Sequence, residues 1–422
     1  MSMVSGKGYK ETEVGWVPSD WKCAPLGGFL TLLTGAPFKS ELFSPSEGVP
    51  LIRIRDLLRG FSETSYIGKF DKRYLVNAGD VLVGMDGEFH VVKWKGLPAL
   101  LNQRILKISG KPGISDEQFL FFLVAHSIGK IQDSISATTV KHLSTKDLQN
   151  LIAAIPPLPQ QQKIATILAA VDGRLEIVAG QIEAAQTLKQ GLMQRLFSRG
   201  AGIQDVNGRW VPHTQFQNSE LGRIPVGWEV KPLAAMSQES RARNAGTLDD
   251  ALLCGVLKDR GLIPMRERVK GATTERCRIV KPNAFAYNPM RINIGSIARN
   301  LNDHEVMVSP DYIVFSVEAG ELMYSYLDHF RRSDEWQRYV GRSGDGGVRI
   351  RIYYDDLAKL CIRVPPLKEQ EKIVEILDCV SEKINNFVAK QRELQTLKRG
   401  LMQKLLTGEW RVKPEGAELL AA

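Results

Sequence analysis

The chain has 422 residues, and its hydrophobic and charged fractions, 43% and 24%, are ordinary for a globular protein. That length excludes a single compact core and predicts two or three domains. Lys and Arg number 56 against 47 Asp and Glu, a net charge of +9. The excess favours a polyanion such as nucleic acid, or an acidic membrane surface, although many soluble proteins with this charge bind no nucleic acid.

The cysteines and the N-terminal residues indicate the compartment. The five cysteines are dispersed, with no CxxC pair and no His at zinc-ligand spacing, which is typical of reduced thiols in the cytoplasm. Residues 1–16 contain no apolar run typical of a signal peptide. No stretch reaches the roughly 18 apolar residues that a membrane-spanning helix needs. We therefore expect a cytoplasmic protein that does not enter a membrane.

The chain contains the same organisation twice. Residues 156–197 align without a gap on residues 365–406, and about 18 of these 42 positions are identical. A weaker repeat opens each half, where residues 12–26 match residues 219–233. The bodies that lie between these repeats have diverged much further. This contrast indicates one task shared by the repeated segments and a different task for each body.

Each repeated segment predicts a long helix with a heptad seam. Apolar residues recur in alternating steps of four and three, which is typical of a coiled coil. The predicted seam residues are Ile164, Leu168, Val171, Leu175, Val178, Ile182, Ile373, Leu377, Val380, Ile384, Phe387 and Leu394. Both seams then take an extra step of three, from Ala185 to Leu188 and from Leu394 to Leu397. They are predicted to continue at Leu188, Leu192, Leu196, Leu397, Leu401 and Leu405. A three-residue skip locally overwinds a supercoil, so its presence in both helices suggests that they pair with each other.

Prolines mark the start of each helix, and Gly200 and Gly408 mark the ends. A helix of about 40 residues is near 60 Å long, which favours a helix pair over the alternative of a cap on its own body. An antiparallel pair would relate the two bodies by a pseudo-twofold axis, a geometry that suits duplex DNA. Gln391 occupies the seam position that Ile182 has in the first helix, where it would set the register or face a partner subunit.

Both bodies are predicted to be mixed α/β, with the same order of elements. Strands are predicted at 49–57, 78–85 and 100–108 in the first body and at 285–290 and 309–317 in the second, with helices at 117–131 and 321–330. The fold class is therefore α+β, with two mixed α/β domains joined by two long antiparallel coiled-coil helices. The predicted divisions are 1–155 (first domain), 156–200 (central helix), 201–222 (linker and opening segment), 223–364 (second domain), 365–408 (C-terminal helix) and 409–422 (tail).

Basic residues are unevenly divided between the bodies. The second body has Arg241, Arg243, Arg266, Arg268, Arg276, Arg278, Arg291, Arg331, Arg332, Arg342, Arg349 and Arg351, and the first has Lys39, Arg53, Arg55, Lys93, Lys95, Arg104 and Lys141. Arginine suits bidentate contacts to guanine and phosphate, although most single surface arginines are only solvated charges.

A turn after one strand of each body is a candidate for reading DNA. Residues 79–90 align on residues 284–295, which pairs Met85 with Met290 and Asp86 with Arg291. An acid in one body and a base in the other would read different base edges in a groove. The alternative is an exposed hairpin tip with arbitrary polar residues.

The sequence lacks the motifs of several catalytic classes. Residues 287–290 (YNPM) lack the second proline and the aromatic residue of the amino-methyltransferase motif, and the nuclease-like residues 310–318 lack the catalytic lysine. No phosphate-binding loop of the GxxxxGK[ST] type occurs. We therefore predict no catalytic, cofactor or metal site. A self-sufficient methyltransferase or nuclease and a coiled-coil adaptor that binds only proteins are the competing hypotheses.

With these features, the chain resembles the specificity subunits of type I restriction–modification systems. The resemblance is strongest in PPLPQQQKIATILAAVD and PPLKEQEKIVEILD, each followed by a helix that closes with LKxGLMQxL. The segments PFKS (37–40), RIRDL (53–57), NQRI (102–105), YNPMRINIGSIARN (287–300) and VSPDYIVF (308–315) are similar to parts of that family's target-recognition domains.

The resemblance implies two target-recognition domains, each reading one half of a split double-stranded DNA sequence, and a helix pair that fixes the spacer between the halves. It also implies docking of two modification subunits, which carry S-adenosylmethionine and adenine methylation, and of restriction subunits, the motor and nuclease, which use ATP. This chain itself would bind neither cofactor and would not be an enzyme. Candidate DNA-binding residues are Lys39, Ser40, Arg53, Arg55, Met85, Asp86, Gln103, Arg104, Asn288, Met290, Arg291 and Asn293.

Overall fold

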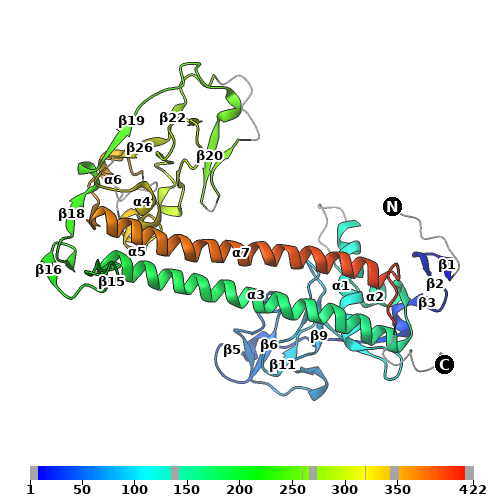
Figure 1. Ribbon diagram of the computed structural model, residues 1–422. Helices are drawn as coiled ribbons and strands as arrows, with labels where there is room; N and C mark the ends of the chain where they lie inside the picture. Colours follow the sequence, from blue (N-terminus) through cyan, green and yellow to red (C-terminus); the bar gives the residue numbers. More distant parts are fainter. Residues whose placement is uncertain are drawn as a thin grey trace. The chain divides into compact units, whose positions relative to one another are not determined.

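The computed structural model describes residues 8–134, 142–258, 260–265, 273–318, 320–342 and 351–413. The chain divides into two compact units, unit 1 (Met1–Ala179 and Ala389–Ala422) and unit 2 (Gly180–Val388). Each unit contains one mixed α/β body and half of each long helix. Figure 1 shows the two helices as uninterrupted rods.

The two long helices, α3 (Leu158–Arg199) and α7 (Leu367–Leu406), run antiparallel. In unit 1, the beginning of α3 and the end of α7 belong to one hydrophobic core, which contains Ile164 and Leu405. In unit 2, the end of α3 and the beginning of α7 share a second core, which contains Leu196 and Ile373. The antiparallel pairing predicted from the repeat is therefore confirmed within each unit.

Each predicted seam residue is at least partly removed from solvent. Six of the side chains are buried: Ile164, Leu168, Val171, Val178, Ile373 and Leu377. The others, Leu175, Ile182, Val380, Ile384, Phe387 and Leu394, are half-buried, as is Gln391. The heptad pattern thus predicted which face of each helix is covered.

The predicted continuation of the seam is wrong at Leu188 and Leu397, whose side chains are 56% and 50% exposed. Half-buried Lys189 and Lys398 replace them. At about 100° per residue, seven residues from Ile182 return Lys189 to within about 20° of the seam, whereas six residues leave Leu188 about 120° short. Helical geometry therefore outweighed the polarity of the lysines.

The central sheet of each body has four antiparallel strands in the same order. In unit 1 the order is β10-β9-β12-β4, formed by β4 (Leu30–Thr34), β9 (Val81–Gly84), β10 (Val91–Lys93) and β12 (Ile105–Gly110). In unit 2 the order is β24-β23-β26-β19, formed by β19 (Ser237–Ser240), β23 (Phe285–Tyr287), β24 (Ile297–Arg299) and β26 (Ile313–Val317). The internal repeat therefore extends to the bodies, although their sequences have diverged.

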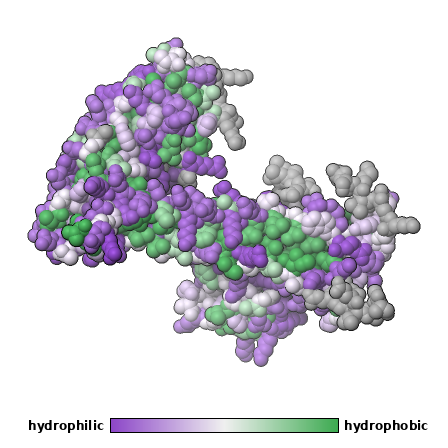
Figure 2. All heavy atoms as spheres, viewed as in Figure 1, coloured by the Kyte–Doolittle hydropathy of each residue, from purple (hydrophilic) through white to green (hydrophobic). Residues whose placement is uncertain are grey.

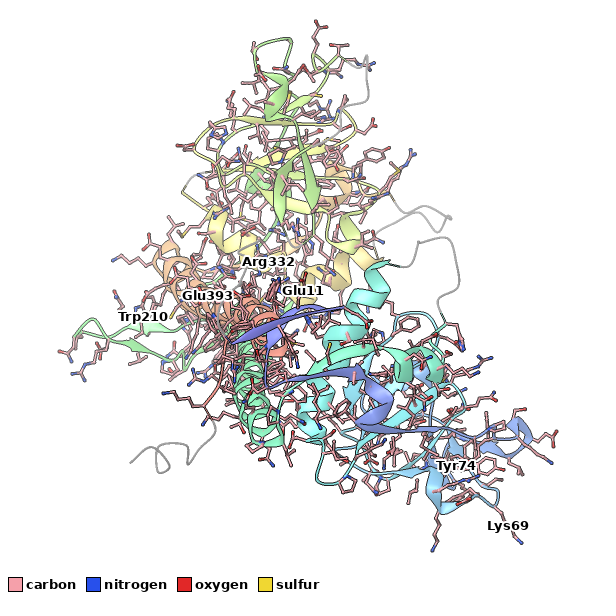
Figure 3. All side chains as sticks on the ribbon, turned by 90° about the vertical axis from the view of Figure 1, so that its right-hand side faces the viewer. Glu11, Lys69, Tyr74, Trp210, Arg332 and Glu393 are labelled. Atoms are coloured by element: carbon pink, nitrogen blue, oxygen red, sulfur yellow. The ribbon has the colours of Figure 1, made fainter. Side chains whose placement is uncertain are left out.

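A second, smaller sheet region accompanies each central sheet. In unit 1 it has the order β5-β7-β6-β11-β8, from β5 (Phe43–Ser44), β6 (Val49–Ile52), β7 (Ser65–Tyr66), β8 (Leu75–Val76) and β11 (Ala99–Leu101), and Tyr74 and Lys69 lie at its outer end (Figure 3). In unit 2 the hairpin of β20 (Cys254–Leu257) and β21 (Gly261–Pro264) is bridged to the pair β22 (Arg278–Val280) and β25 (Val306–Val308). The single strand predicted at 100–108 is wrong, because β11 and β12 belong to different sheets and residues 102–104 turn between them.

Short helices and strands complete each unit. The helices are α1 (Glu117–Ser134) and α2 (Thr145–Asn150) in unit 1 and α4 (Tyr324–Phe330), α5 (Asp334–Arg342) and α6 (Tyr354–Leu357) in unit 2. The opening segments form hairpins of β1 (Tyr9–Thr12) with β2 (Gly15–Pro18) and of β16 (Phe216–Ser219) with β17 (Gly222–Pro225). The remaining pairs are β3 (Lys22–Pro25) with β13 (Ile152–Ile155), β18 (Glu229–Pro232) with β27 (Cys361–Val364), and β14 (Ile203–Gln204) with β15 (Trp210–Val211), which carries the Trp210 labelled in Figure 3.

A buried tryptophan ties the opening segment of each unit to a long helix. In unit 1 the Trp21 Nε1–H donates to Gln160 Oε1 at 2.9 Å. In unit 2 the Trp228 Nε1–H donates to Glu369 Oε2 at 2.7 Å, and the other carboxylate oxygen lies 2.8 Å from His213 Nε2. These polar residues at the start of each helix are buried because they satisfy the indole donor, which would otherwise be unpaired in the core.

Candidate nucleic-acid interface

The sheet register decides how the two candidate turns correspond. The main-chain oxygen of Met85 accepts a backbone hydrogen bond at 2.8 Å, and the equivalent bond in unit 2, at 3.0 Å, is accepted by Pro289. Together with the register of the central strands, this bond makes Pro289 the counterpart of Met85, and Met290 the counterpart of Asp86. The sequence alignment that paired Asp86 with Arg291 is therefore wrong by one residue, and a one-residue shift in a strand exchanges the two faces.

The corrected register changes which methionine can reach a ligand. Met85 is only 7% exposed and packs in the core of unit 1, so its assignment as a DNA contact is wrong. Met290 is 42% exposed. Met85 follows a strand whose four residues are all buried, and the close packing of that core holds its side chain inward.

Asp86 organises a polar cluster in unit 1. His142 Nδ1 lies 2.6 Å from one carboxylate oxygen, and Arg104 Nη1 lies 3.4 Å from the other. Both oxygens are therefore engaged, so Asp86 orients two donors instead of offering a free acceptor. The Arg104 side chain is 58% exposed, and the neighbouring Gln103 is also exposed. His142 was not among the residues predicted from the sequence. Its one sequence signal is that the offset of 209 residues, which relates the two long helices, also relates His142 to Arg351.

The turn that carries Gln103 and Arg104 is held against the segment that leads to Lys39 and Ser40. The Gln103 amide donates to the carbonyl of residue 36 at 3.0 Å. A Cβ atom at Gly35 would lie 2.2 Å from a carbonyl oxygen of this turn, so only glycine fits there. Lys39 and Ser40 are exposed just beyond this contact. The structure therefore presents these four polar side chains from one fixed junction between the two sheets.

Arg53 and Arg55 belong to the small sheet of unit 1. The Arg53 amide donates to Asp56 Oδ2 at 2.9 Å, and its half-buried guanidinium contacts the Thr64 hydroxyl. The Arg55 side chain is 56% exposed and lies 3.9 Å from Asp56. Arg53 thus braces the fold, whereas Arg55 is available to a ligand.

Unit 2 has a hollow of about 610 Å³ beside Met290. Its polar lining is Glu239, Arg241, Arg243, Arg278, Asp311, Arg351, Tyr353, Tyr354 and Asp355, and its apolar lining is Pro289, Met290, Pro310 and Ile313. Two of its lining residues are the counterparts of the cluster in unit 1: Met290 corresponds to Asp86 by strand register, and Arg351 corresponds to His142 by the offset of 209. The hollow therefore occupies the position in unit 2 that the Asp86 cluster occupies in unit 1.

Glu239 anchors two of the arginines of this hollow. Its carboxylate accepts from Arg278 at 2.8 Å and from Arg241 at 2.9 Å. Burial opposes ionisation of Glu239, but the two guanidinium groups outweigh it and hold the pKa of Glu239 below its ordinary value. Among the described residues, Arg243 and Arg351 form no ion pair, and both are exposed.

The turn after β23 carries the four candidate residues of unit 2, but their side chains have different surroundings. The half-buried Asn288 side chain accepts from the Met290 amide at 2.9 Å and so shapes the turn. Arg291 and Asn293 are exposed but do not line the hollow. Of the four candidates in unit 2, only Met290 lies at the hollow itself.

Other predicted basic residues have structural roles or are not described. Arg331 is buried, pairs with Asp328 at 2.7 Å and donates to the Ile297 carbonyl at 2.9 Å, so it does not belong to a DNA-facing basic surface. Lys141, Arg266, Arg268 and Arg349 lie outside the described residues. Within the described ranges there is no group of three or more metal-ligating side chains, and no helix is long and apolar enough to cross a membrane.

Comparison with known proteins identifies the family. The family described as "Type I restriction modification DNA specificity domain" matches residues 18–187 and 289–396. The specificity subunit of the type I restriction enzyme EcoBI of Escherichia coli is 26% identical over 94% of this chain and 88% of its own length. The MjaVIII specificity subunit of Methanocaldococcus jannaschii is 22% identical over 98% of both chains.

A solved structure has the same fold. The crystal structure of the type I restriction–modification S subunit from M. genitalium superposes with a TM-score of 0.56, at 15% identity, over 92% of this chain and 96% of that one. The family match spans more than half of the chain and includes parts of both bodies and most of both long helices. The chain therefore belongs to the type I restriction–modification DNA specificity family.

Proposed function

We propose that this chain reads a split DNA target, one half-site for each unit, as the specificity subunit of a type I restriction–modification complex. The observation that carries the proposal is a shared scaffold with unlike surfaces. The central sheets have the same strand order, yet the same junction holds the Asp86 cluster in unit 1 and an arginine-lined hollow in unit 2. Two copies of one fold with different donors and acceptors suit two different base sequences.

The helix pair would set the spacing of the half-sites. A rise of about 1.5 Å per residue gives a heptad a length near 10 Å, or about three base pairs of B-DNA. Deleting one heptad from both α3 and α7 should therefore shorten the preferred spacer or abolish recognition. An unchanged spacer would contradict the role of the helices as a ruler.

The same helices would hold two modification subunits. Gln186, Thr187 and Leu188 are exposed and identical to Gln395, Thr396 and Leu397, which are also exposed. Exposed apolar side chains that recur in both halves suit two copies of one protein partner. On the face seen in Figure 2, apolar side chains gather over the part of the helix pair that belongs to unit 1.

In this proposal the chain is a non-catalytic cytoplasmic subunit. S-adenosylmethionine would bind to the modification subunits and ATP to the restriction subunits, and this chain would bind neither. A coiled-coil adaptor that binds only proteins would not need two polar recognition junctions. Under the proposed function, by contrast, methylation requires the modification subunit and follows the sequence preference of this chain.

The test is a genome-wide map of methylated adenines in cells that carry the modification subunit with and without this chain. We expect a split motif that appears only when this chain is present. If methylation by an active partner does not depend on the chain, the specificity role is wrong and the adaptor hypothesis replaces it.

A further inference from the structure

The hollow of unit 2 contains two kinds of guanidinium group. Arg241 and Arg278 both donate to the Glu239 carboxylate, which orients their guanidinium groups and leaves the three residues with a net charge of +1. Arg243 and Arg351 are exposed and have no ion-pair partner among the described residues. Arg243 and Arg351 are therefore the two arginines of the hollow that a ligand can engage without competition from a described carboxylate.

The main chain of these two free arginines is fixed. Arg243 forms a β-bridge with Arg278. Arg351 directly precedes Ile352, whose amide donates to the Pro289 carbonyl at 3.0 Å. Because the backbone is already ordered, only the side chains lose conformational entropy when a ligand binds. The planar guanidinium group presents its donors in a fixed geometry, so arginine loses little entropy for each hydrogen bond that it forms.

The lining contains an available acceptor as well as donors. Asp311 is exposed at the edge of the hollow, and no side-chain hydrogen bond or ion pair joins it to another described residue. A carboxylate repels phosphate, so a hollow that serves only the DNA backbone would gain nothing from it. Donors beside an acceptor instead match a base edge.

A G·C pair has this pattern in the major groove. Guanine offers its O6 and N7 acceptors, to which arginine donates in a bidentate manner, and cytosine offers an N4 amino donor, which a carboxylate accepts. The apolar Pro289, Met290 and Pro310 would exclude water from the contact, which strengthens each hydrogen bond.

We propose that the hollow of unit 2 reads a G·C pair, with Arg243 or Arg351 donating to guanine and Asp311 accepting from cytosine. This inference rests on the proposed function. It goes further by assigning a base pair to one unit: the half-site read by unit 2 contains guanine at the position that faces the hollow. Unit 1 has the Asp86 cluster at this junction and would read a different sequence.

The test compares single substitutions within the complete methyltransferase complex. Arg243→Ala, Arg351→Ala, Arg351→Lys and Asp311→Ala are each expressed with the modification subunit, and their adenine methylation motifs are mapped. Methylation rates are then measured on duplexes in which one base pair of the motif is changed. Arg209→Ala removes another exposed arginine, from the β14–β15 hairpin of the same unit, and is the matched control.

We expect a motif in which at least one half contains a G·C pair. Discrimination at that pair should fall roughly ten- to a hundredfold in an arginine variant and in Asp311→Ala, with the other half of the motif unchanged. Arg351→Lys keeps the charge but loses the fork, so if Arg351 is the reader it should lose discrimination while it keeps most of the attraction to DNA. Arg209→Ala should keep the wild-type motif. Equal unfolding midpoints for all variants would show that the fold is intact.

Two outcomes would overturn the inference, and they differ in what they leave standing. A chain-dependent split motif without any G·C pair, or with no loss of discrimination in any of the substituted proteins, would refute the G·C assignment but keep the proposed function. Methylation that is independent of the chain would refute both.

Discussion

In both units a half-buried lysine occupies the seam between α3 and α7, but the polar groups that contact this lysine differ. In unit 1, Lys398 pairs with Asp172 at 2.6 Å, and its Nζ lies 5.6 Å from the centre of the Phe122 ring. In unit 2, Lys189 at the equivalent position donates to the Ser381 hydroxyl at 2.7 Å. The helices therefore tolerate changes of partner as long as each half-buried lysine keeps an acceptor.

A second exchange accompanies the first. Gln161 accepts from the Asp116 amide and its counterpart Gln370 accepts from the Met323 amide, an offset of 207 that makes His329 the counterpart of Phe122. His329 Nε2 lies 2.8 Å from Asp378 Oδ1. The scaffold thus conserves shape and the pairing of polar groups, while the recognition junctions differ in chemistry altogether. Substitutions that exchange residues between the units separate these two kinds of constraint.

The largest effect is expected at the buried tryptophans. Trp228→Ala and Trp21→Ala each remove a fully buried indole and should destabilise their unit by about 3–5 kcal/mol. Trp228→Ala should cost about 1–3 kcal/mol more, because it removes a donor from a buried carboxylate, whereas Gln160 is neutral. Urea unfolding of the purified chain measures both, with half-exposed Trp410→Ala as the control. Equal losses for Trp21→Ala and Trp228→Ala would contradict the role given to Glu369.

The next effect concerns the binding of partners. Leu188→Asp and Leu397→Asp should each weaken capture of one modification subunit by about 2 kcal/mol or more, the usual cost at an interface hot spot. Ile177→Asp is the control, because Ile177 is also exposed but its counterpart is Asn386. Titration followed by native mass spectrometry gives the number of bound subunits. Full assembly by the double leucine variant would show that the partners bind elsewhere.

A smaller effect is expected from exchanging Asp172 and Ser381, the residues that contact the half-buried lysines of the seam. Ser381→Asp supplies unit 2 with the acid of unit 1 and should stabilise it by about 0.5–1 kcal/mol, since such partly exposed pairs contribute little. Asp172→Ser should destabilise unit 1 by a similar amount. Thermal unfolding at low and high salt checks the assignment, because only the ionic pairs should weaken with salt. A stability change that does not depend on salt would argue against ion pairing.

The smallest effect is a dependence on pH at His329. Burial lowers the pKa of His329 and outweighs the hydrogen bond to the Asp378 carboxylate, which raises it, while Lys189 and Arg332 add repulsion that lowers it further. A histidine whose folded pKa is below its unfolded value binds its proton more strongly when unfolded, so unit 2 should lose stability as pH falls below about 6.5. His329→Phe, which installs the residue of unit 1, should flatten this slope. The unfolding midpoints of the wild-type chain and of His329→Phe are measured as a function of pH around this value. Equal slopes of midpoint against pH for the two proteins would refute the assignment.

The sequence by itself determined the repeat, the long helices and the seam. These features depend on local properties: a heptad period, prolines before the first turn, and glycine after the last. Identity between distant segments established the repeat, and helix length with the shared seam pattern favoured a helix pair. The basic excess with the family's motifs indicated a DNA-reading role. Arg243 and Arg351 were recognisable as members of a basic group, but nothing in the sequence distinguished them from buried Arg331.

Only the tertiary structure decided which side chains converge. His142 meets Asp86 across 56 residues of chain, and Arg351 lies beside Met290 through a hydrogen bond between their neighbours. Sheet register buried Met85, because a shift of one residue exchanges the faces of a strand. Helical geometry turned Lys189 inward and Leu188 outward against their polarity. Such outcomes depend on packing between segments distant in the chain, which local patterns do not encode.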